Sequence, residues 1–372
     1  MAQGFSLKDQ LFNRAKIAGL GRDLAQAQSA FDAAAFEQRV MARLPDLELK
    51  ARITWIADIL DEMLPKDFDA AARIIENALP PPLDPTMRDD DFGDFIFAPY
   101  GEFAVKRGLE NHCDRALDLI GTVTQRFSME YAIRPFLNRW PDAVYDRLSA
   151  WARHPHYHVR RLVSEGTRPR LPWGIGIETE PERALALLDI LHADQTRFVT
   201  RSVANHLNDI SKTAPDLVLH RLAEWRKSGR QTAREMDWMT SHALRGLIKS
   251  GDARAMAMLG YDPDAPVTCA LTIDTPKVAI GQAVCFTVTL QAVSDTPVLV
   301  DWVLDFAPGA GRRGPKVFKL KQARIKAGTP LILTKSHRLK GDATTFRLTP
   351  GEHRISVQVN GRVMADATFA LT

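Results

Sequence analysis

A pattern that returns after 40 residues constrains the fold of this chain more than any other feature. Residues 159–165 (Val-Arg-Arg-Leu-Val-Ser-Glu) resemble residues 199–205 (Val-Thr-Arg-Ser-Val-Ala-Asn), and residues 146–151 resemble residues 220–225. Each unit has the pattern of a helix, a short polar turn and a second helix with Val-x-Arg near its start. Such helical pairs bury their apolar faces only by stacking on neighbours. The sequence therefore predicts a HEAT-like helical-repeat solenoid over residues 100–266.

The preceding 99 residues carry the same helical periodicity, and we assign them to one all-α domain with the repeats, residues 1–266. Apolar residues at helical spacing predict helices over residues 24–44, 47–64 and 68–79. Pro65 ends the second helix, and Pro80 ends the third. An acidic, Phe-containing loop follows over residues 80–98 and includes Asp89, Asp90 and Asp91. This part of the chain shows no chemistry and is expected to be scaffold.

The residue pattern changes after Pro263 and Pro266, where short segments of alternating apolar and polar residues, typical of strands, begin. They cover residues 267–273, 283–290, 298–304, 344–348 and 351–359, separated by Gly, Pro and Asn-Gly turns. This pattern predicts a small all-β immunoglobulin-like sandwich over residues 267–372. A basic run over residues 309–326 includes Arg312 and Arg313. It fits either a solvated edge strand guarded by lysines or a hairpin that contacts phosphates.

Charge is distributed unevenly along the chain. Residues 1–125 hold 14 Lys and Arg against 21 Asp and Glu, a balance of −7, whereas residues 126–266 hold 21 against 17 (+4) and residues 267–372 hold 14 against 7 (+7). The basic later parts suggest a polyanionic partner. No apolar run is long enough for a membrane span, and three cysteines in 372 residues fit a reducing cytoplasm better than a disulfide framework.

Residues 197–212 form the most informative helix of the repeat region. Val199, Val203, Leu207 and Ile210 make one apolar stripe, while a second face carries Arg201, Asn205 and Asp209, with Asn208 beside it. Asn and Asp are poor helix formers because their side chains compete for backbone hydrogen bonds. Either this is an Asx-rich helix end, or the polar face has a function, which we favour because the segment has relatives in neighbouring units.

Three carboxylates occupy comparable positions in successive units: Glu130, Glu165 and Asp209. Arg134 lies four residues after Glu130, and Arg161 lies four residues before Glu165, so ordinary intrahelical ion pairs would explain two of the acids taken singly. Taken together, three acids flanked by arginines could converge on one concave patch. That convergence is the hypothesis that we carry forward.

Other chemistry is poorly supported. The sequence has no phosphate-binding Gly-rich loop and no His-Glu-x-x-His helix, and His154, His156 and His158 alternate without a partner that would complete a metal site. We therefore expect no metal and no cofactor. The last unit, residues 235–249, reads as one helix with Trp238, His242 and Arg245 at helical spacing, suited to core packing or to binding. Arg161, Arg201 and Arg245 would project from successive second helices.

Two of the motifs are specific. Residues 202–212 read Ser-Val-Ala-Asn-His-Leu-Asn-Asp-Ile-Ser-Lys, and residues 164–173 read Ser-Glu-Gly-Thr-Arg-Pro-Arg-Leu-Pro-Trp. With residues 127–136 and 242–249, they resemble the AlkC-type DNA alkylation repair glycosylases, and the similarity covers the whole chain. His206 lies within the motif at a position that we expect to be variable.

The resemblance implies a HEAT-like enzyme of base excision repair that hydrolyses the N-glycosidic bond of cationic N3-alkylated bases, 3-methylcytosine and 3-methyladenine, without full base flipping. It implies double-stranded DNA as partner and a cytoplasmic, nucleoid-associated protein of bacterial type, which we expect to be monomeric. It implies Glu130, Glu165 and Asp209 as the catalytic acids. The expected substrate- and DNA-binding residues are Arg134, Arg161, Arg168, Arg170, Trp173, Arg201, Asn205, Asn208, Trp238, His242 and Arg245.

The chemistry agrees with this assignment. A base that already carries positive charge leaves the sugar without a general acid, so the site needs negative charge near the developing oxocarbenium ion and a held water, which carboxylates supply. An alternative is a non-catalytic helical-repeat scaffold for nucleic acid or protein. Carboxylates beside the arginines favour the enzyme, because a pure phosphate clamp has no use for them on that face.

Overall fold

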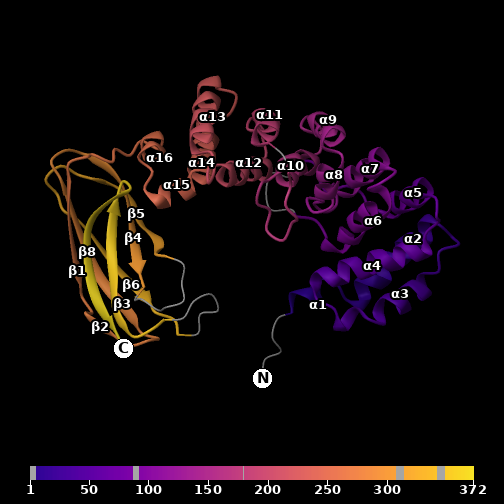
Figure 1. Ribbon diagram of the computed structural model, residues 1–372, viewed down its shortest axis with the longest axis horizontal. Helices are drawn as coiled ribbons and strands as arrows, with labels where there is room; N and C mark the ends of the chain where they lie inside the picture. Colours follow the sequence, from indigo (N-terminus) through magenta and orange to yellow (C-terminus); the bar gives the residue numbers. More distant parts are fainter. Residues whose placement is uncertain (1–5, 87–91, 179, 307–313, 342–347) are drawn as a thin grey trace. The chain divides into compact units, whose positions relative to one another are not determined.

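The structure is a computed structural model that describes residues 6–86, 92–178, 180–306, 314–341 and 348–372. The chain divides into two compact units, one formed by residues up to 213 with residues 222–243, and the other by residues 214–221 and 244–372. In Figure 1 the helices of the first unit run from indigo to magenta, and the strands of the second run from orange to yellow. No helix among the described residues is long and apolar enough to cross a membrane.

The first part of the helical unit consists of short amphipathic helices. They are α1 (Leu7–Leu11), α2 (Arg14–Ala27), α3 (Ala33–Met41), the 3-10 helix η1 (Leu44–Asp46), α4 (Leu49–Met63), α5 (Phe68–Ala78), the 3-10 helix η2 (Phe95–Phe97), α6 (Ala98–Gly108) and α7 (Cys113–Val123). The single helix predicted over residues 24–44 is wrong. The chain leaves α2 at Gln28, and the Asp32 side chain caps α3 by accepting a hydrogen bond from the Ala35 amide. Of the acidic loop, residues 87–91 lie outside the described residues.

The second part of the helical unit contains the predicted repeats. Its helices are α8 (Ile133–Arg139), α9 (Pro141–Trp151), α10 (Tyr157–Gly166), α11 (Pro181–Leu191), α12 (Arg197–Ile210), part of α13 (Pro215–Ser228) and α14 (Ala233–Ala243). Helices α10, α12 and α14 pack side by side, and they are the second helices of the predicted pairs. The predicted apolar stripe of α12 is buried, with Val199, Val203 and Leu207 fully inaccessible to solvent. Hydrophobic burial of this stripe therefore holds the three helices in register.

The single helix predicted over residues 235–249 is also wrong. Helix α14 ends at Ala243, Leu244 leaves helical geometry, and α15 (Arg245–Ser250) begins a new helix. Because α15 belongs to the second compact unit, Arg245 lies in a different unit from Trp238 and His242.

The second unit contains α15, α16 (Ala253–Met258) and two β-sheets. One sheet has the strand order β1-β3-β6 and the other β2-β8-β7-β4-β5. The strands are β1 (Val267–Ile273), β2 (Lys277–Val278), β3 (Ala283–Ala292), β4 (Thr296–Asp305), β5 (Lys316–Ile325), β6 (Leu331–Arg338), β7 (Gly351–Val359) and β8 (Arg362–Leu371). Pairings are antiparallel except between β2 and β8. Trp302 and Phe286 lie in the core between the sheets.

The basic run forms strand β5, which is the last strand in its sheet. Lys319, Lys321 and Arg324 are exposed along it, as expected for an edge that resists further pairing. Arg312 and Arg313 lie outside the described residues, as does most of the strand predicted at 344–348. Whether the run also contacts phosphates stays a prediction.

Candidate active site

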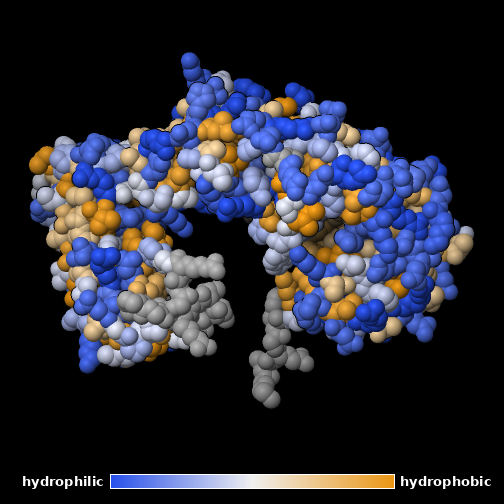
Figure 2. Space-filling view, viewed as in Figure 1, coloured by the Kyte–Doolittle hydropathy of each residue, from blue (hydrophilic) through white to orange (hydrophobic). Residues whose placement is uncertain are grey.

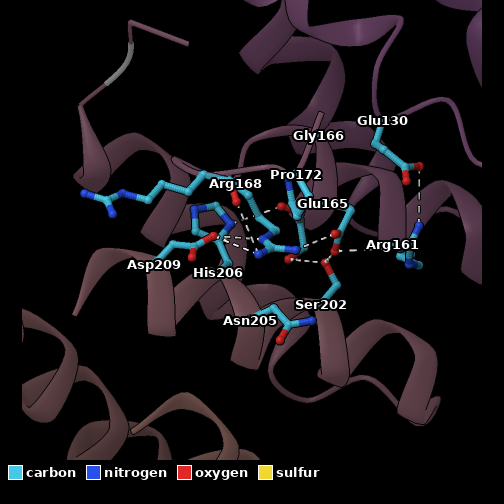
Figure 3. Close-up of polar contacts among 12 residues, drawn as sticks. Glu130, Arg161, Glu165, Gly166, Arg168, Pro172, Ser202, Asn205, His206 and Asp209 are labelled. Atoms are coloured by element: carbon cyan, nitrogen blue, oxygen red, sulfur yellow. Dashed lines mark hydrogen bonds and ion pairs between the residues drawn. The ribbon is translucent and has the colours of Figure 1, made fainter. Parts of the chain in front are cut away.

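Acidic and basic side chains alternate in a chain of contacts across three segments of the helical unit (Figure 3). Glu130 Oε2 lies 3.6 Å from Arg161 Nη1, and Glu165 Oε2 lies 3.8 Å from Arg161 Nη2. Arg168 then bridges two acids, with Nη1 2.6 Å from Glu165 Oε1 and Nη2 2.9 Å from Asp209 Oδ2. The three predicted carboxylates are therefore brought together, and arginines separate them.

Two of these acids are buried. Glu165 on α10 and Asp209 on α12 are 6% and 4% exposed. Burial alone would raise the pKa of Glu165, but the charges of Arg161 and Arg168 and a 2.6 Å hydrogen bond from Ser202 Oγ outweigh it and lower the pKa below its ordinary value. Glu165 is thus ionised at neutral pH despite its burial.

The guanidinium group of Arg168 donates its hydrogen bonds to other atoms of the protein. Nε donates to Asp209 Oδ2 at 3.0 Å, and Nη2 also donates to the carbonyl of Arg170 at 3.3 Å. Burial lowers the pKa of Arg168, but Glu165 and Asp209 raise it above its ordinary value. Arg168 is 8% exposed, so its geometry suits holding the two acids, whereas the sequence analysis predicted that it binds substrate or DNA. Arg170, two residues on, is exposed.

Glu130 lies in a turn before α8 and not on a helix. Its Oε2 atom is buried and has no hydrogen-bond partner among the described residues, apart from the longer ion pair to Arg161. Arg161 is itself fixed by a 2.7 Å hydrogen bond to Ser128 Oγ and lies over the ring of Phe198 at 4.5 Å. Among the three acids, Glu130 therefore has an oxygen, Oε2, that remains available to accept a hydrogen bond.

Arg134 does not pair with Glu130, contrary to the spacing argument. It is 1% exposed, and it donates to the carbonyls of Gly166, Arg168 and Ile175 at 2.9, 2.9 and 2.6 Å. Burial, together with the charge of Arg168, lowers the pKa of Arg134 to about 10. Arg134 consequently anchors the segment that follows α10.

Trp173 projects from that anchored segment. Its side chain is 66% exposed and its backbone has φ 65°, a conformation that is strained for a residue with a Cβ atom. Lys50 Nζ donates to the Trp173 carbonyl at 2.6 Å, and Tyr131 donates to the Pro172 carbonyl at 3.3 Å. A strained backbone that is held on several sides, with an exposed indole, is typical of a binding residue.

Sequence reasoning missed His206, which is a core residue. It is fully buried, and its Nδ1 atom lies 3.0 Å from the carbonyl of Ser164, so this nitrogen carries the proton. Burial lowers the pKa of His206 to about 4, which keeps the imidazole neutral. No pattern in the sequence marks this contact, because it joins α12 to the separate helix α10.

A second cluster joins α12 to α14. His242 stacks on Trp238 with ring centroids 4.9 Å apart, and its Nε2 atom lies 2.9 Å from Asn205 Oδ1. Arg197 lies 3.8 Å over the Trp238 ring and pairs with Glu235, two residues that sequence reasoning did not select. Of the remaining predicted residues, Arg201 is half-buried and Asn208 is 6% exposed.

A cavity of about 360 Å³ lies beside the acid cluster in the same unit. It is bordered by α4, α6, the turn before α8 and the Trp173 segment. Apolar residues also gather around a hollow on the visible face of the helical unit in Figure 2. Among the described residues, no group of three His, Cys, Asp or Glu side chains has the arrangement of a metal site.

Comparisons with known proteins agree with this architecture. The family described as DNA alkylation repair enzyme matches residues 123–247, and the C-terminal Ig-like domain described for the uncharacterised protein YhaZ matches residues 268–372. YhaZ of Bacillus subtilis is 34% identical over 329 residues, which cover 87% of this chain and 88% of YhaZ. The Pseudomonas fluorescens alkylpurine DNA glycosylase AlkC, bound to DNA containing an abasic site analogue, superposes with a TM-score of 0.86 at 29% identity, over 99% of this chain and 100% of AlkC.

The chain belongs to the AlkC-type DNA alkylation repair family. The predicted fold class, a HEAT-like helical domain followed by an immunoglobulin-like sandwich, is confirmed for this AlkC-type protein. Glu130, Glu165 and Asp209 all fall within the residues that match the repair family.

Proposed function

We propose that this chain is a DNA N-glycosylase that removes cationic alkylated bases, such as 3-methyladenine and 3-methylcytosine, from double-stranded DNA. The observation that carries the proposal is the meeting of three carboxylates from successive helical units in one cluster, Glu130, Glu165 and Asp209. The full-length likeness to an alkylpurine DNA glycosylase supports it.

The reaction needs no cofactor. As the bond between C1′ and the base nitrogen breaks, both electrons go to the cationic base, which leaves as a neutral molecule. The sugar becomes an oxocarbenium ion, a water oxygen then bonds to C1′, and the proton released from that water passes to a carboxylate or to solvent. Carboxylates near C1′ stabilise the positive charge and orient the water.

The cluster is suited to this chemistry because of where its charges lie, although their formal sum is zero. Arg161, Arg168 and Lys212 balance the three carboxylates, but Glu130 has only the longer 3.6 Å contact with Arg161, whereas Glu165 and Asp209 have closer partners. Glu130 has spare hydrogen-bonding capacity and would act on the sugar and the water. Arg168 would keep Glu165 ionised behind it and hold Asp209 in place. A well-placed electrostatic group of this kind contributes about 3–4 kcal/mol to transition-state stabilisation.

Contacts with DNA would come from the exposed residues around the cluster. Arg170 and Trp173 stand on the segment that Arg134 anchors, where a guanidinium group can meet a phosphate and an indole face can attract a cationic base. Arg168 and Arg134 are committed to internal contacts and would support this segment from within.

Incubation with duplex oligonucleotides carrying one 3-methyladenine or one 3-methylcytosine, followed by alkaline cleavage at abasic sites, tests the proposal. We expect release of free base by the parent protein and by Glu182→Gln, an exposed control on α11. Glu130→Gln should abolish release while DNA binding is retained. If Glu130→Gln, Glu165→Gln and Asp209→Asn all cleave like the parent, these acids are not catalytic.

One observation favours a non-catalytic alternative. Glu165 and Asp209 are buried and ion-paired, as acids with a purely structural role would be. A helical scaffold of this kind would bind DNA in a salt-dependent manner without base release, so the same oligonucleotide assay distinguishes it from the enzyme.

A further inference from the structure

The cavity beside the acid cluster shares a wall with it. Ser128 and Tyr131 line the cavity, and Glu130 lies between them in the same turn. The Ser128 hydroxyl also accepts the 2.7 Å hydrogen bond from Arg161, which contacts Glu130. The cavity is therefore close to the place where a base would be detached beside Glu130.

The walls suit a flat, uncharged ring system. Aromatic side chains of Phe95, Phe127, Tyr131 and Trp173 contribute to the lining, and the rings of Phe95 and Phe127 lie 4.8 Å apart. The volume of about 360 Å³ falls within the range of about 300–1,000 Å³ that is typical of small-molecule sites. An excised base is neutral, so entering an apolar cavity costs it little desolvation.

Among the polar residues of the described lining, Glu102 on α6 carries the one carboxyl group. No hydrogen bond to this group is found within the described ranges, so it is available to a ligand. Burial and the neighbouring charge of Asp58 raise the pKa of Glu102, against the attraction of Lys106. In either protonation state a carboxyl oxygen of Glu102 can accept a hydrogen bond. The exocyclic amino group of an aminopurine supplies the matching donor.

We propose that this cavity receives the excised base, an alkylated aminopurine such as 3-methyladenine, after the glycosidic bond is broken, with Glu102 as its hydrogen-bonding partner. The inference rests on the proposed glycosylase function. It does not require the base to leave the DNA stack before cleavage, because the free base is no longer tethered to the sugar.

Isothermal titration calorimetry with free 3-methyladenine tests the cavity directly. The parent protein and Glu182→Gln should bind one equivalent. Glu102→Leu should weaken binding about tenfold or more, since it removes the hydrogen-bonding group. Glu102→Gln should stay within about threefold of the parent, because the amide oxygen still accepts a hydrogen bond from the amino group. Thr54→Trp, from an exposed position on the cavity wall, should block binding without disturbing the core.

Absence of saturable binding to the parent, or parent-like affinity in Glu102→Leu, overturns the inference. Thermal unfolding of each variant shows that a loss of binding is not a loss of fold. Base release from alkylated DNA without binding of free base overturns the cavity and keeps the proposed function. Binding of free base without any release from DNA does the reverse, so the two failures are distinguishable.

Discussion

Replacing Arg168 by Met removes the side chain that joins Glu165 to Asp209. Two buried carboxylates are then left with weaker partners, Arg161 at 3.8 Å from Glu165 and Lys212 at 3.0 Å from Asp209. Breaking a buried ion pair by removing one partner costs about 3–5 kcal/mol of stability. Because Arg161, Lys212 and Ser202 remain, we expect the lower end of that range, about 3 kcal/mol.

The loss of stability in Arg168→Met should be larger at high pH than at low pH. In the parent, the pKa of Glu165 is held below its ordinary value, so its stabilisation is present at neutral pH and is lost as pH falls through the folded-state pKa. In Arg168→Met, burial and the facing charge of Asp209 should raise the pKa of Glu165 above its ordinary value. The unfolding free energy of the variant should then fall as pH rises through that raised pKa.

Urea denaturation at about pH 5 and about pH 8 measures both effects. Arg168→Met should lose more stability at the higher pH, whereas Arg170→Met, an exposed neighbour, should match the parent at both. If Arg168→Met is as stable as the parent at the higher pH, or loses stability equally at both, Arg168 does not hold the acids as described. In the glycosylase assay, the acid limb of the rate profile should move to higher pH with the variant.

Two further predictions concern groups outside the acid cluster. Arg134→Lys should destabilise the segment after α10, because an ammonium group cannot reproduce the planar guanidinium group that donates to three carbonyls. Proteolysis of the folded variant near Trp173 should therefore be faster than in the parent. An unchanged rate of proteolysis would refute this. In the sandwich, burial raises the pKa of Asp301 to about 6 against the attraction of Lys319, so its ionisation opposes folding as pH rises. Asp301→Asn should therefore raise the melting temperature most at about pH 8, less near pH 5 where the folded-state carboxyl is largely protonated, and least near about pH 3.5, below the ordinary pKa. The exposed Glu352→Gln serves as control, and an equal shift at all three pH values would contradict the reasoning.

Local patterns in the sequence were sufficient to predict the type of fold. The 40-residue recurrence and the apolar stripe of α12 predicted stacked helical pairs, and the change to alternation after Pro266 predicted strands that begin at Val267. The spacing of apolar residues indicates which face of a helix or strand is buried. This indication holds however the helices and strands are arranged in the tertiary structure. Helix ends were less predictable, because a capping side chain such as Asp32 or a single non-helical residue such as Leu244 decides them.

The candidate acids were chosen from the sequence, but their environment was not foreseen. The spacing of four residues predicted an ion pair between Glu130 and Arg134. In the structure, Glu130 pairs with Arg161, and Arg134 donates hydrogen bonds to carbonyls of the loop after α10. Spacing predicts neighbours within one helix, whereas these contacts join separate segments of the chain. The sequence analysis did not select Glu102 either, because the cavity that it lines is formed by segments far apart in the sequence.

The sequence by itself determined which residue types were present and which faces of the helices and strands are apolar, because those properties depend only on local order along the chain. Only the tertiary structure decided that Arg168 bridges Glu165 and Asp209 inside the protein, that His206 is neutral, and that a cavity lies beside Glu130. Ionisation and hydrogen bonding depend on burial and on charges brought close through space, and the order of residues does not specify either quantity.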